Sequence, residues 1–279
     1  MAEVRFKIGQ VAVGEEPFVI AGPCAVESKE VAFRAAEEIK KVESAAGIRF
    51  IYKSSYTKAN RLSADSFATI GAVAALEILD EVKREFDLPI LTDVHAVSEI
   101  GDAAAVADCL QIPAFLCRQT ELVQKAAATG LPINIKKGQF MAPDDMDKIA
   151  RKATAVGNAK VMLTERGTSF GYHDLIVDFR SLVTMAGFGW PVVFDCTHAV
   201  QKPGAGGGYS GGDPAFIFPL AKAAAAVGID GLFVETHPDP ANALSDRDCQ
   251  LPLNKLRKFV LAVMEIWRLS NRTNKIQIQ

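Results

Sequence analysis

The sequence predicts a single (β/α)8 barrel, the TIM-barrel form of the α/β class, with a short N-terminal β-hairpin. Its 279 residues fit one barrel of about 250 residues with a small extension. Short runs rich in Val, Ile and Phe alternate with longer Ala-rich stretches, which is the pattern of βα units with parallel strands. No linker, low-complexity tract or charge block divides the chain. We therefore expect residues 1–279 to form one domain, with residues 1–16 as the hairpin extension.

Eight apolar runs are predicted to be the barrel strands. Each is short and bounded by turn-forming or polar residues. They are residues 18–22, 49–54, 89–95, 109–114, 132–137, 161–166, 191–197 and 231–236. In the stretches between and after them, apolar residues recur at spacings of three and four, which predicts helices. These cover residues 29–44, 69–86, 98–107, 119–129, 144–156, 213–227 and 252–270.

Two further segments have a predicted place in the barrel. Residues 4–13 indicate two short strands around a turn, and this hairpin is expected to close the N-terminal mouth. The glycine-rich stretch 203–212 follows the seventh strand. It lacks the Gly-Lys-Ser/Thr sequence of a phosphate-binding loop, so we interpret it as a lid over the other mouth.

Composition and charge exclude several classes of partner. Lys and Arg number 31 against 33 Asp and Glu, so no global field favours nucleic acid or an anionic membrane. The apolar stretches are shorter than the roughly 20 residues of a membrane span, and the N-terminus lacks a signal-peptide core, which favours a cytoplasmic protein. The odd, scattered set of five cysteines indicates thiols or metal ligands rather than disulfides. They are Cys24, Cys109, Cys117, Cys196 and Cys249.

Four residues spread over the chain are candidate metal ligands: Cys24, His198, Glu235 and Asp246. The first three follow or end the first, seventh and eighth strands, which are neighbours in a closed barrel. A lone cysteine such as Cys24 is more often a small buried apolar residue. A thiol, an imidazole and two carboxylates on neighbouring strands, however, suit Zn²⁺, Fe²⁺ or Mn²⁺. The sequence therefore predicts a divalent metal site and no organic cofactor.

Basic residues follow the remaining strands, at the end of the barrel where such enzymes bind their substrates. One Lys or Arg after a strand is usually a solvated loop charge, but six after consecutive strands indicate an anion site for phosphate or carboxylate groups. These six are Lys53, Lys58, Arg61, Arg118, Lys136 and Arg166. Asp93 and His95 follow the third strand and are candidates for polar contacts or proton transfer.

Seven motifs together resemble the 3-deoxy-D-manno-octulosonate 8-phosphate synthases, also called 2-dehydro-3-deoxyphosphooctonate aldolases. The resemblance extends from residue 4 into the final predicted helix. The motifs cover residues 58–61, 111–119, 136–140, 163–168, 177–182, 235–238 and 243–246. Sister enzymes that use erythrose 4-phosphate usually carry Lys-Pro-Arg-Thr where this chain has Lys-Ala-Asn-Arg, so the resemblance favours arabinose 5-phosphate. The family's metal-independent branch has Asn at the position of Cys24, so the resemblance implies the metal-dependent branch.

The resemblance also implies a reaction and a set of residue roles. Phosphoenolpyruvate would condense with D-arabinose 5-phosphate and water, with release of phosphate, in the synthesis of a lipopolysaccharide sugar. Arg118 would reach the aldose phosphate across a subunit interface, which implies a homotetramer. The residues on phosphoenolpyruvate would be Lys53, Lys58, Gln111, Lys136 and Arg166, and those on the aldose Asn60, Arg61 and Ser63. Whether the metal would activate water or polarise the aldehyde stays open.

The stretch after Arg61 departs from the family pattern. Leu62 stands where the family usually has a hydroxyl residue, and an Arg-Gly loop is missing; Ser63 is the candidate to replace the hydroxyl. Two alternatives therefore stay open. One is a related synthase that uses another aldose, such as erythrose 4-phosphate. The other is a non-catalytic barrel that binds sugar phosphates.

Overall fold

Eight parallel strands close into a barrel at the centre of the protein. The computed structural model describes residues 4–59, 67–204 and 211–273. The barrel closes because β14 pairs with both β3 and β11, while the other strands pair in chain order. The strands are β3 Phe18–Gly22, β4 Arg49–Lys53, β5 Ile90–Asp93, β6 Cys109–Ile112, β7 Ile133–Lys136, β8 Val161–Glu165, β11 Val192–Asp195 and β14 Gly231–His237. The predicted barrel is confirmed, and each predicted strand overlaps an observed one.

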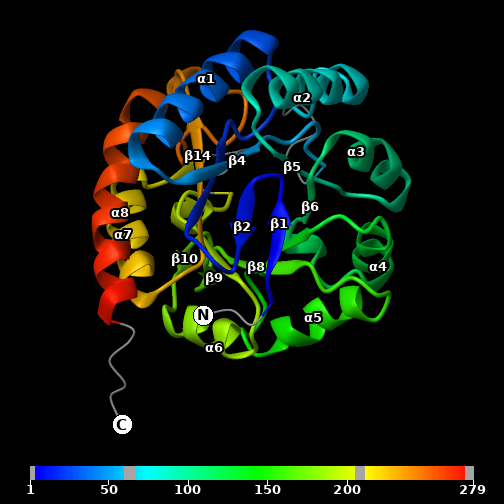
Figure 1. Ribbon diagram of the computed structural model, residues 1–279, viewed down its shortest axis with the longest axis vertical. Coiled ribbons are helices and arrows are strands. Elements are labelled where there is room, and N and C mark those ends of the chain that lie inside the picture. The colour runs from blue at the N-terminus through cyan, green and yellow to red at the C-terminus, as the bar shows by residue number, and fades with distance from the viewer. Residues whose placement is uncertain (1–3, 60–66, 205–210, 274–279) are drawn as a thin grey trace.

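The described chain has eight α-helices, which form a ring around the barrel (Figure 1). They are α1 Lys29–Ala46, α2 Ala72–Phe86, α3 Ile100–Val106, α4 Thr120–Ala128, α5 Asp145–Thr154, α6 Arg180–Gly187, α7 Ile217–Val227 and α8 Leu256–Thr273. Helix α6 was missing from the predicted set. It has eight residues and buries only Ser181, Leu182 and Met185, so its apolar repeat is too short to stand out in sequence. Among the described residues, none of the helices combines the length and apolar character needed to cross a membrane.

The N-terminal hairpin closes one end of the barrel, as predicted. Strands β1 (Phe6–Ile8) and β2 (Val11–Val13) pair antiparallel and lie across the barrel opening (Figure 1). Three hairpin side chains are buried against the residues that fill the barrel interior, so this end is packed with apolar groups. The interior cluster comprises Ile8, Val11, Val13, Phe18, Ile20, Ile51, Leu91, Cys109, Met162, Val193 and Phe233. The barrel interior beneath the hairpin is therefore apolar.

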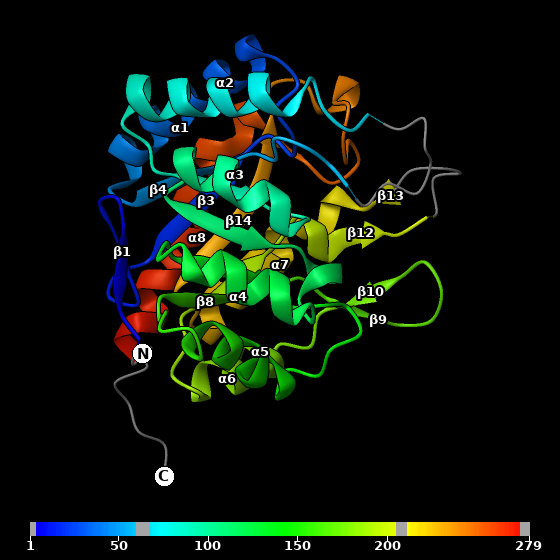
Figure 2. The same ribbon diagram turned by 90° about the vertical axis from the view of Figure 1, so that its right-hand side faces the viewer.

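Two further hairpins project from the opposite end (Figure 2). Strands β9 (Thr168–Ser169) and β10 (Leu175–Ile176) form one, and β12 (Gln201–Lys202) and β13 (Gly211–Gly212) form the other. The second hairpin brackets the predicted lid, most of which lies outside the described residues, so the lid stays a prediction.

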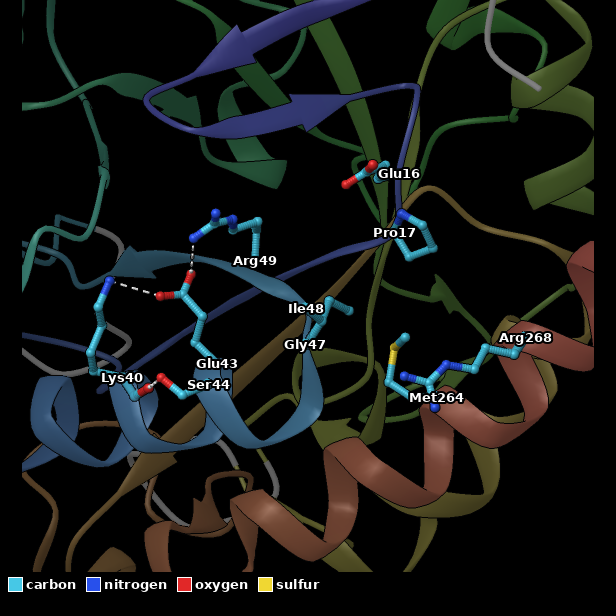
Figure 3. Close-up of a pocket in the computed structure, with 10 residues that line it drawn as sticks. All are labelled: Glu16, Pro17, Lys40, Glu43, Ser44, Gly47, Ile48, Arg49, Met264 and Arg268. Carbon is cyan, nitrogen blue, oxygen red and sulfur yellow. Dashed lines mark hydrogen bonds and ion pairs between the residues drawn. The ribbon is translucent and has the colours of Figure 1, made fainter.

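A cavity of about 780 Å³ lies at the hairpin end of the barrel, where β3 and β4 begin (Figure 3). Its basic groups are partly neutralised within the cavity, because Glu43 pairs with Lys40 at 2.8 Å and contacts Arg49 at 3.9 Å. The lining residues are Glu16, Pro17, Lys40, Glu43, Ser44, Gly47, Ile48, Arg49, Met264 and Arg268. None of the predicted site residues that the structure describes lines this cavity.

A carboxyl at this end makes barrel stability depend on pH. Asp230 precedes β14 and accepts a hydrogen bond from the backbone N–H of Val192 at 2.8 Å. Burial raises the pKa of Asp230, and the hydrogen bond offsets this only in part. A carboxyl whose pKa is higher in the folded chain than in the unfolded chain stabilises the fold at pH values below its unfolded pKa. That contribution is lost as the pH rises through the folded pKa.

We therefore expect the melting temperature of Asp230→Asn, relative to that of the wild type, to be higher at neutral pH than at acidic pH. The asparagine oxygen can still accept from Val192, but no charge has to be buried at neutral pH. Thermal unfolding of both proteins at about pH 7 and about pH 4 measures the difference, since an unfolded aspartate titrates near the lower value. A difference in melting temperature that is equal at both pH values would contradict this expectation.

Candidate active site

The C-terminal ends of the strands place an unusual number of polar groups inside the protein. Lys53, Asp93, Lys136, Arg166 and Glu235 are each at most 5% exposed. Charged groups are buried only where other charges and hydrogen bonds compensate their lost hydration. Most of these side chains contact one another at the barrel end opposite the N-terminal hairpin, so this mouth is the candidate active site.

Three of the four predicted metal ligands form one group. The ligand atoms of Cys24, Glu235 and Asp246 all lie within 4.8 Å of one another. The Cys24 thiol is buried, with its Sγ 3.0 Å from Asp246 Oδ2 and 2.9 Å from the hydroxyl of Ser245. Asp246 adopts a left-handed backbone conformation with φ of 48°, and its carbonyl accepts from the N–H of Cys249 in the same turn. The turn therefore presents the Asp246 carboxylate to the thiol.

Gly22 allows the segment that bears Cys24 to lie against β4. Its φ is 155°, and a Cβ at this position would lie 2.1 Å from the backbone oxygen of Lys53. Only glycine permits so close an approach of the two chains. As a consequence, the Lys53 ammonium reaches the carbonyl of Cys24 at 3.3 Å.

His198, the fourth predicted ligand, stands beside this group. Its Nε2 lies 3.6 Å from Glu235 Oε1 and 3.9 Å from Asp246 Oδ2. Its Nδ1 lies 2.7 Å from Asp195 Oδ2 and donates to that carboxylate. A carboxylate on one imidazole nitrogen orients the ring and leaves the other nitrogen for a metal.

Asp195 is the main site residue that sequence reasoning missed. It ends β11, is fully buried and also accepts from the ammonium of Lys136 at 2.6 Å. Burial by itself raises the pKa of Asp195, but the charges and hydrogen bonds of His198 and Lys136 outweigh it, so the pKa lies well below its usual range. The sequence did contain a signal for it: Asp195 ends an apolar strand and precedes the candidate ligand His198 by three residues.

The donor set fits a divalent cation. Among the described residues, Glu235 Oε2 is buried without a hydrogen-bond partner, which is costly unless a ligand satisfies it. Burial and the negative charges of Asp246 and Glu235 raise the pKa of the Cys24 thiol well above its ordinary value. A cation among these groups would reverse that effect, because a coordinating thiol is deprotonated.

Basic side chains line the mouth beside the acidic group. The Lys53 ammonium lies 3.3 Å from Glu235 Oε1 and 3.8 Å from Asp93 Oδ1. The centre of the Phe233 ring lies 4.0 Å from the ammonium of Lys136 and 5.8 Å from that of Lys53. Burial lowers the pKa of Lys136, the nearby charge of Lys53 acts in the same direction, and Asp195 and Glu235 oppose the shift.

Arg166 has a free donor for an anion. Its Nη2 donates to the side-chain oxygen of Gln201 at 2.5 Å, whereas its buried Nη1 has no hydrogen-bond partner among the described residues. Gln111, at the end of β6, is buried and accepts from the amide of Asn134 at 3.1 Å. Together with the lysines, these groups form a cationic surface that can hold oxyanions through charge-assisted hydrogen bonds.

Comparisons with known proteins identify the family. The sequence profile of the DAHP synthetase I family matches residues 3–271. The chain belongs to this family. It is 52% identical over 249 residues to the 2-dehydro-3-deoxyphosphooctonate aldolase of Acidithiobacillus ferrooxidans (strain ATCC 53993 / BNL-5-31), covering 89% of each chain. Aldolases of the same name from Hydrogenovibrio crunogenus and Bartonella henselae are 48% and 50% identical over 269 residues, which is 96% of this chain and 97% and 96% of theirs. These matches confirm the aldolase family and enzyme class that the motifs predict.

Asp93 and His95, the predicted proton-transfer residues, contact each other at the same barrel mouth. His95 Nε2 is 3.0 Å from Asp93 Oδ2, and the hydroxyl of Ser55 donates to the other Asp93 oxygen at 2.5 Å. Burial by itself raises the pKa of Asp93, yet the nearby positive charges, Lys53 foremost, hold it well below its ordinary range. Burial alone would lower the pKa of Lys58, but the surrounding thiol and carboxylates raise it, so Lys58 stays charged.

Of the predicted aldose residues, Arg118 is the one that the structure describes. It is exposed, two residues before α4, and its backbone carbonyl accepts from Lys152. Asn60, Arg61 and Ser63 lie outside the described residues, as does Leu62. Ser245 and Gln250 were not predicted, yet Ser245 contacts the Cys24 thiol and Gln250 accepts from the Cys24 N–H at 3.2 Å. Both lie within four residues of Asp246, which was their one sequence signal.

Proposed function

We propose that the protein uses a metal-dependent site to condense phosphoenolpyruvate with D-arabinose 5-phosphate and water. The products are 3-deoxy-D-manno-octulosonate 8-phosphate and phosphate, in the synthesis of a lipopolysaccharide sugar. The observation that carries this assignment is the convergence of a cationic surface and a thiol-carboxylate group at one barrel mouth. The relatives' shared name, 2-dehydro-3-deoxyphosphooctonate aldolase, supports the same reaction.

In this proposal the basic surface holds phosphoenolpyruvate. Its phosphate and carboxylate need several cations, and the unpartnered Nη1 of Arg166 offers one donor directly. Burial strengthens these interactions because little water competes for the anion. Fixed cations also offset the repulsion between two phosphorylated substrates and hold them in register for reaction. The assigned set is Lys53, Lys58, Gln111, Lys136 and Arg166.

Cys24, His198, Glu235 and Asp246 are the residues that would hold the metal. A thiolate, an imidazole and two carboxylates suit Zn²⁺, Fe²⁺ or Mn²⁺. When bound, such an ion supplies Lewis acidity at the reacting centre. Asp195 holds the His198 ring so that Nε2 is directed toward the carboxylates. No organic cofactor enters the proposal.

The reaction adds the water oxygen to C2 of phosphoenolpyruvate, joins C3 to the aldehyde carbon and breaks the C2–O bond, so that phosphate leaves. The protein's own groups must orient water and move its proton. We assign proton transfer to the pair of His95 and Asp93, since their side chains meet at 3.0 Å. The depressed pKa keeps Asp93 ionised, so its carboxylate can orient the His95 ring.

We assign the aldose phosphate to Asn60, Arg61, Ser63 and, from a neighbouring subunit, Arg118. This arrangement requires a homo-oligomer, and we propose a homotetramer. Support comes from exposed aromatic side chains near Arg118 in sequence and on the β9–β10 hairpin that projects from this end (Figure 2). Phe115 is 53% exposed, and Phe170 and Tyr172 are 66% and 95% exposed. Large exposed apolar groups at one end of a protein favour association with another protein surface.

The remaining expectations complete the proposal. The whole chain works as one barrel domain with residues 1–16 as its hairpin extension. Its partners are small phosphorylated molecules and copies of itself, with no role for nucleic acid or membranes. All five cysteines are free and buried, which suits the reducing cytoplasm.

Phosphate release tests the proposal together with its alternatives. We expect release from phosphoenolpyruvate with arabinose 5-phosphate, loss of release after EDTA treatment, and recovery with Mn²⁺ or Zn²⁺. Release with erythrose 4-phosphate instead would assign the other aldose and implicate the segment around Leu62. Ligand-induced stabilisation without release from any aldose would favour a binding protein. Full activity after complete metal removal would contradict the metal-dependent site.

A further inference from the structure

We infer that Glu27 is a positioning residue that joins the three chain segments bearing Cys24, Glu235 and Asp246. The inference rests on the proposed metal site and deepens it. Glu27 lies three residues after Cys24, in the loop between β3 and α1. Its side chain is only 7% exposed, so it is held inside the protein rather than in solvent.

One oxygen of Glu27 fixes the turn that presents Asp246. Glu27 Oε1 accepts from the backbone N–H of Leu244 at 2.8 Å, across 217 residues of sequence. Leu244 is followed by Ser245, which contacts the Cys24 thiol, and then by Asp246 itself. Asp246 has a left-handed backbone that is unfavourable for a non-glycine residue. The surrounding structure must therefore hold the turn, and Glu27 supplies a contact from outside it.

The other oxygen of Glu27 faces the segment that bears Glu235. Glu27 Oε2 lies 3.4 Å from Nε2 of His237, which follows Glu235 by two residues on β14. The opposite imidazole nitrogen, Nδ1, accepts from the N–H of Asp239 at 3.0 Å. Nε2 therefore carries the ring hydrogen. It makes no hydrogen bond among the described residues, so its contact with the Glu27 carboxylate is electrostatic only.

Through these contacts the Glu27 carboxylate links the segments that bear the candidate ligands. It touches none of the candidate ligand atoms, so its effect on a metal must pass through the positions of the segments that it joins. Residues that orient ligands in this way typically change metal affinity by about 10- to 100-fold when they are substituted. The sequence offered no signal, because an acidic residue before a helix usually caps that helix or lies in solvent.

The test compares metal binding by the wild type, Glu27→Ala, Glu27→Gln and Asp108→Ala. Asp108 is the matched control, since its carboxylate accepts from a backbone N–H at the same 2.8 Å, at the start of β5 at the other end of the barrel. Two readouts are needed for each full-length protein, freed of metal and titrated with Co²⁺. They are the dissociation constant, from competition with a chelator, and the near-ultraviolet absorption of a cobalt-thiolate bond.

We expect Glu27→Ala to raise the Co²⁺ dissociation constant about 10- to 100-fold and to weaken or shift the thiolate band. Glu27→Gln should fall between it and the wild type, because the amide oxygen can still accept from Leu244. Asp108→Ala should lower the melting temperature of the metal-free protein but leave both cobalt readouts unchanged.

The outcomes separate this inference from the proposed function. If both Glu27 variants bind Co²⁺ with the wild-type dissociation constant and show the wild-type thiolate band, the inference is overturned and the proposed metal site is unaffected. No Co²⁺ binding and no thiolate band in the wild type would overturn the metal site and the inference with it. If Glu27→Ala does not fold, Glu27→Gln with wild-type values would still overturn the inference.

Discussion

Replacement of Cys24 by alanine is expected to abolish metal retention and, with it, phosphate release. The Cys24 thiol lies in contact with Asp246 and within the group that contains Glu235. Loss of the thiolate removes a direct ligand, so the metal dissociation constant should rise by more than the roughly 100-fold upper range for residues that only orient ligands. Metal content after dialysis and phosphate release in the presence of added Mn²⁺ measure the two effects.

Cys109→Ala is the matched control for this experiment. Cys109 is also fully buried, but it belongs to the apolar cluster that fills the barrel beneath the N-terminal hairpin. Its substitution should cost some stability and leave metal content unchanged. If Cys24→Ala keeps the wild-type metal content and activity, the assignment of the metal site is wrong.

Replacement of Lys136 by methionine is expected to lower kcat about 100- to 1,000-fold, as loss of one preorganised charge-stabilising donor commonly does. The Lys136 ammonium contacts Asp195 at 2.6 Å and the Phe233 ring at 4.0 Å, inside the candidate site. Methionine preserves most of the side-chain length but cannot neutralise a substrate anion. Steady-state kinetics with phosphoenolpyruvate as the varied substrate measure the loss.

Lys137→Met provides a control from the adjacent residue. The Lys137 ammonium is also buried, but it donates to the hydroxyl of Thr168 at 3.0 Å and lies 3.5 Å from Glu165. Its loss removes the ion-pair partner of the buried Glu165 carboxylate. Among the described residues, that carboxylate then keeps only the hydrogen bonds from the N–H groups of Arg166 and Gly167 and from the Ser181 hydroxyl, so stability should fall. We expect Lys137→Met to have a lower melting temperature than the wild type. At temperatures where it is folded, its kcat should equal that of the wild type. A larger loss of kcat in Lys137→Met than in Lys136→Met would reverse the roles assigned to the two lysines.

Much of the fold was predictable because its signals are local. Each barrel strand is a short apolar run with polar residues at its C-terminal end, and most helices repeat apolar residues over several turns. Helix α6 escaped prediction because only three of its eight residues are buried. The N-terminal hairpin was predicted from two short runs around residues 7–10, and it does close the barrel, with its turn at Gly9 and Gln10.

The candidate site was predictable in its residue types but not in its contacts. Cys24, His198, Glu235 and Asp246 carry side chains that suit a metal wherever the chain places them. The structure groups Cys24, Glu235 and Asp246 and leaves His198 beside them. Asp195 was missed since a strand aspartate reveals its role only when Lys136 and His198 are seen on the same oxygen.

The sequence by itself determined the barrel, the end of it that carries chemistry, and the family to which the chain belongs. Only the tertiary structure decided that Lys136 faces the site while Lys137 faces Glu165, and that Glu27 reaches Leu244 across 217 residues. The physical reason is that periodicity and residue type are properties of neighbouring residues. Barrel closure and strand register, which bring distant side chains to one mouth, depend on the packing of the whole chain.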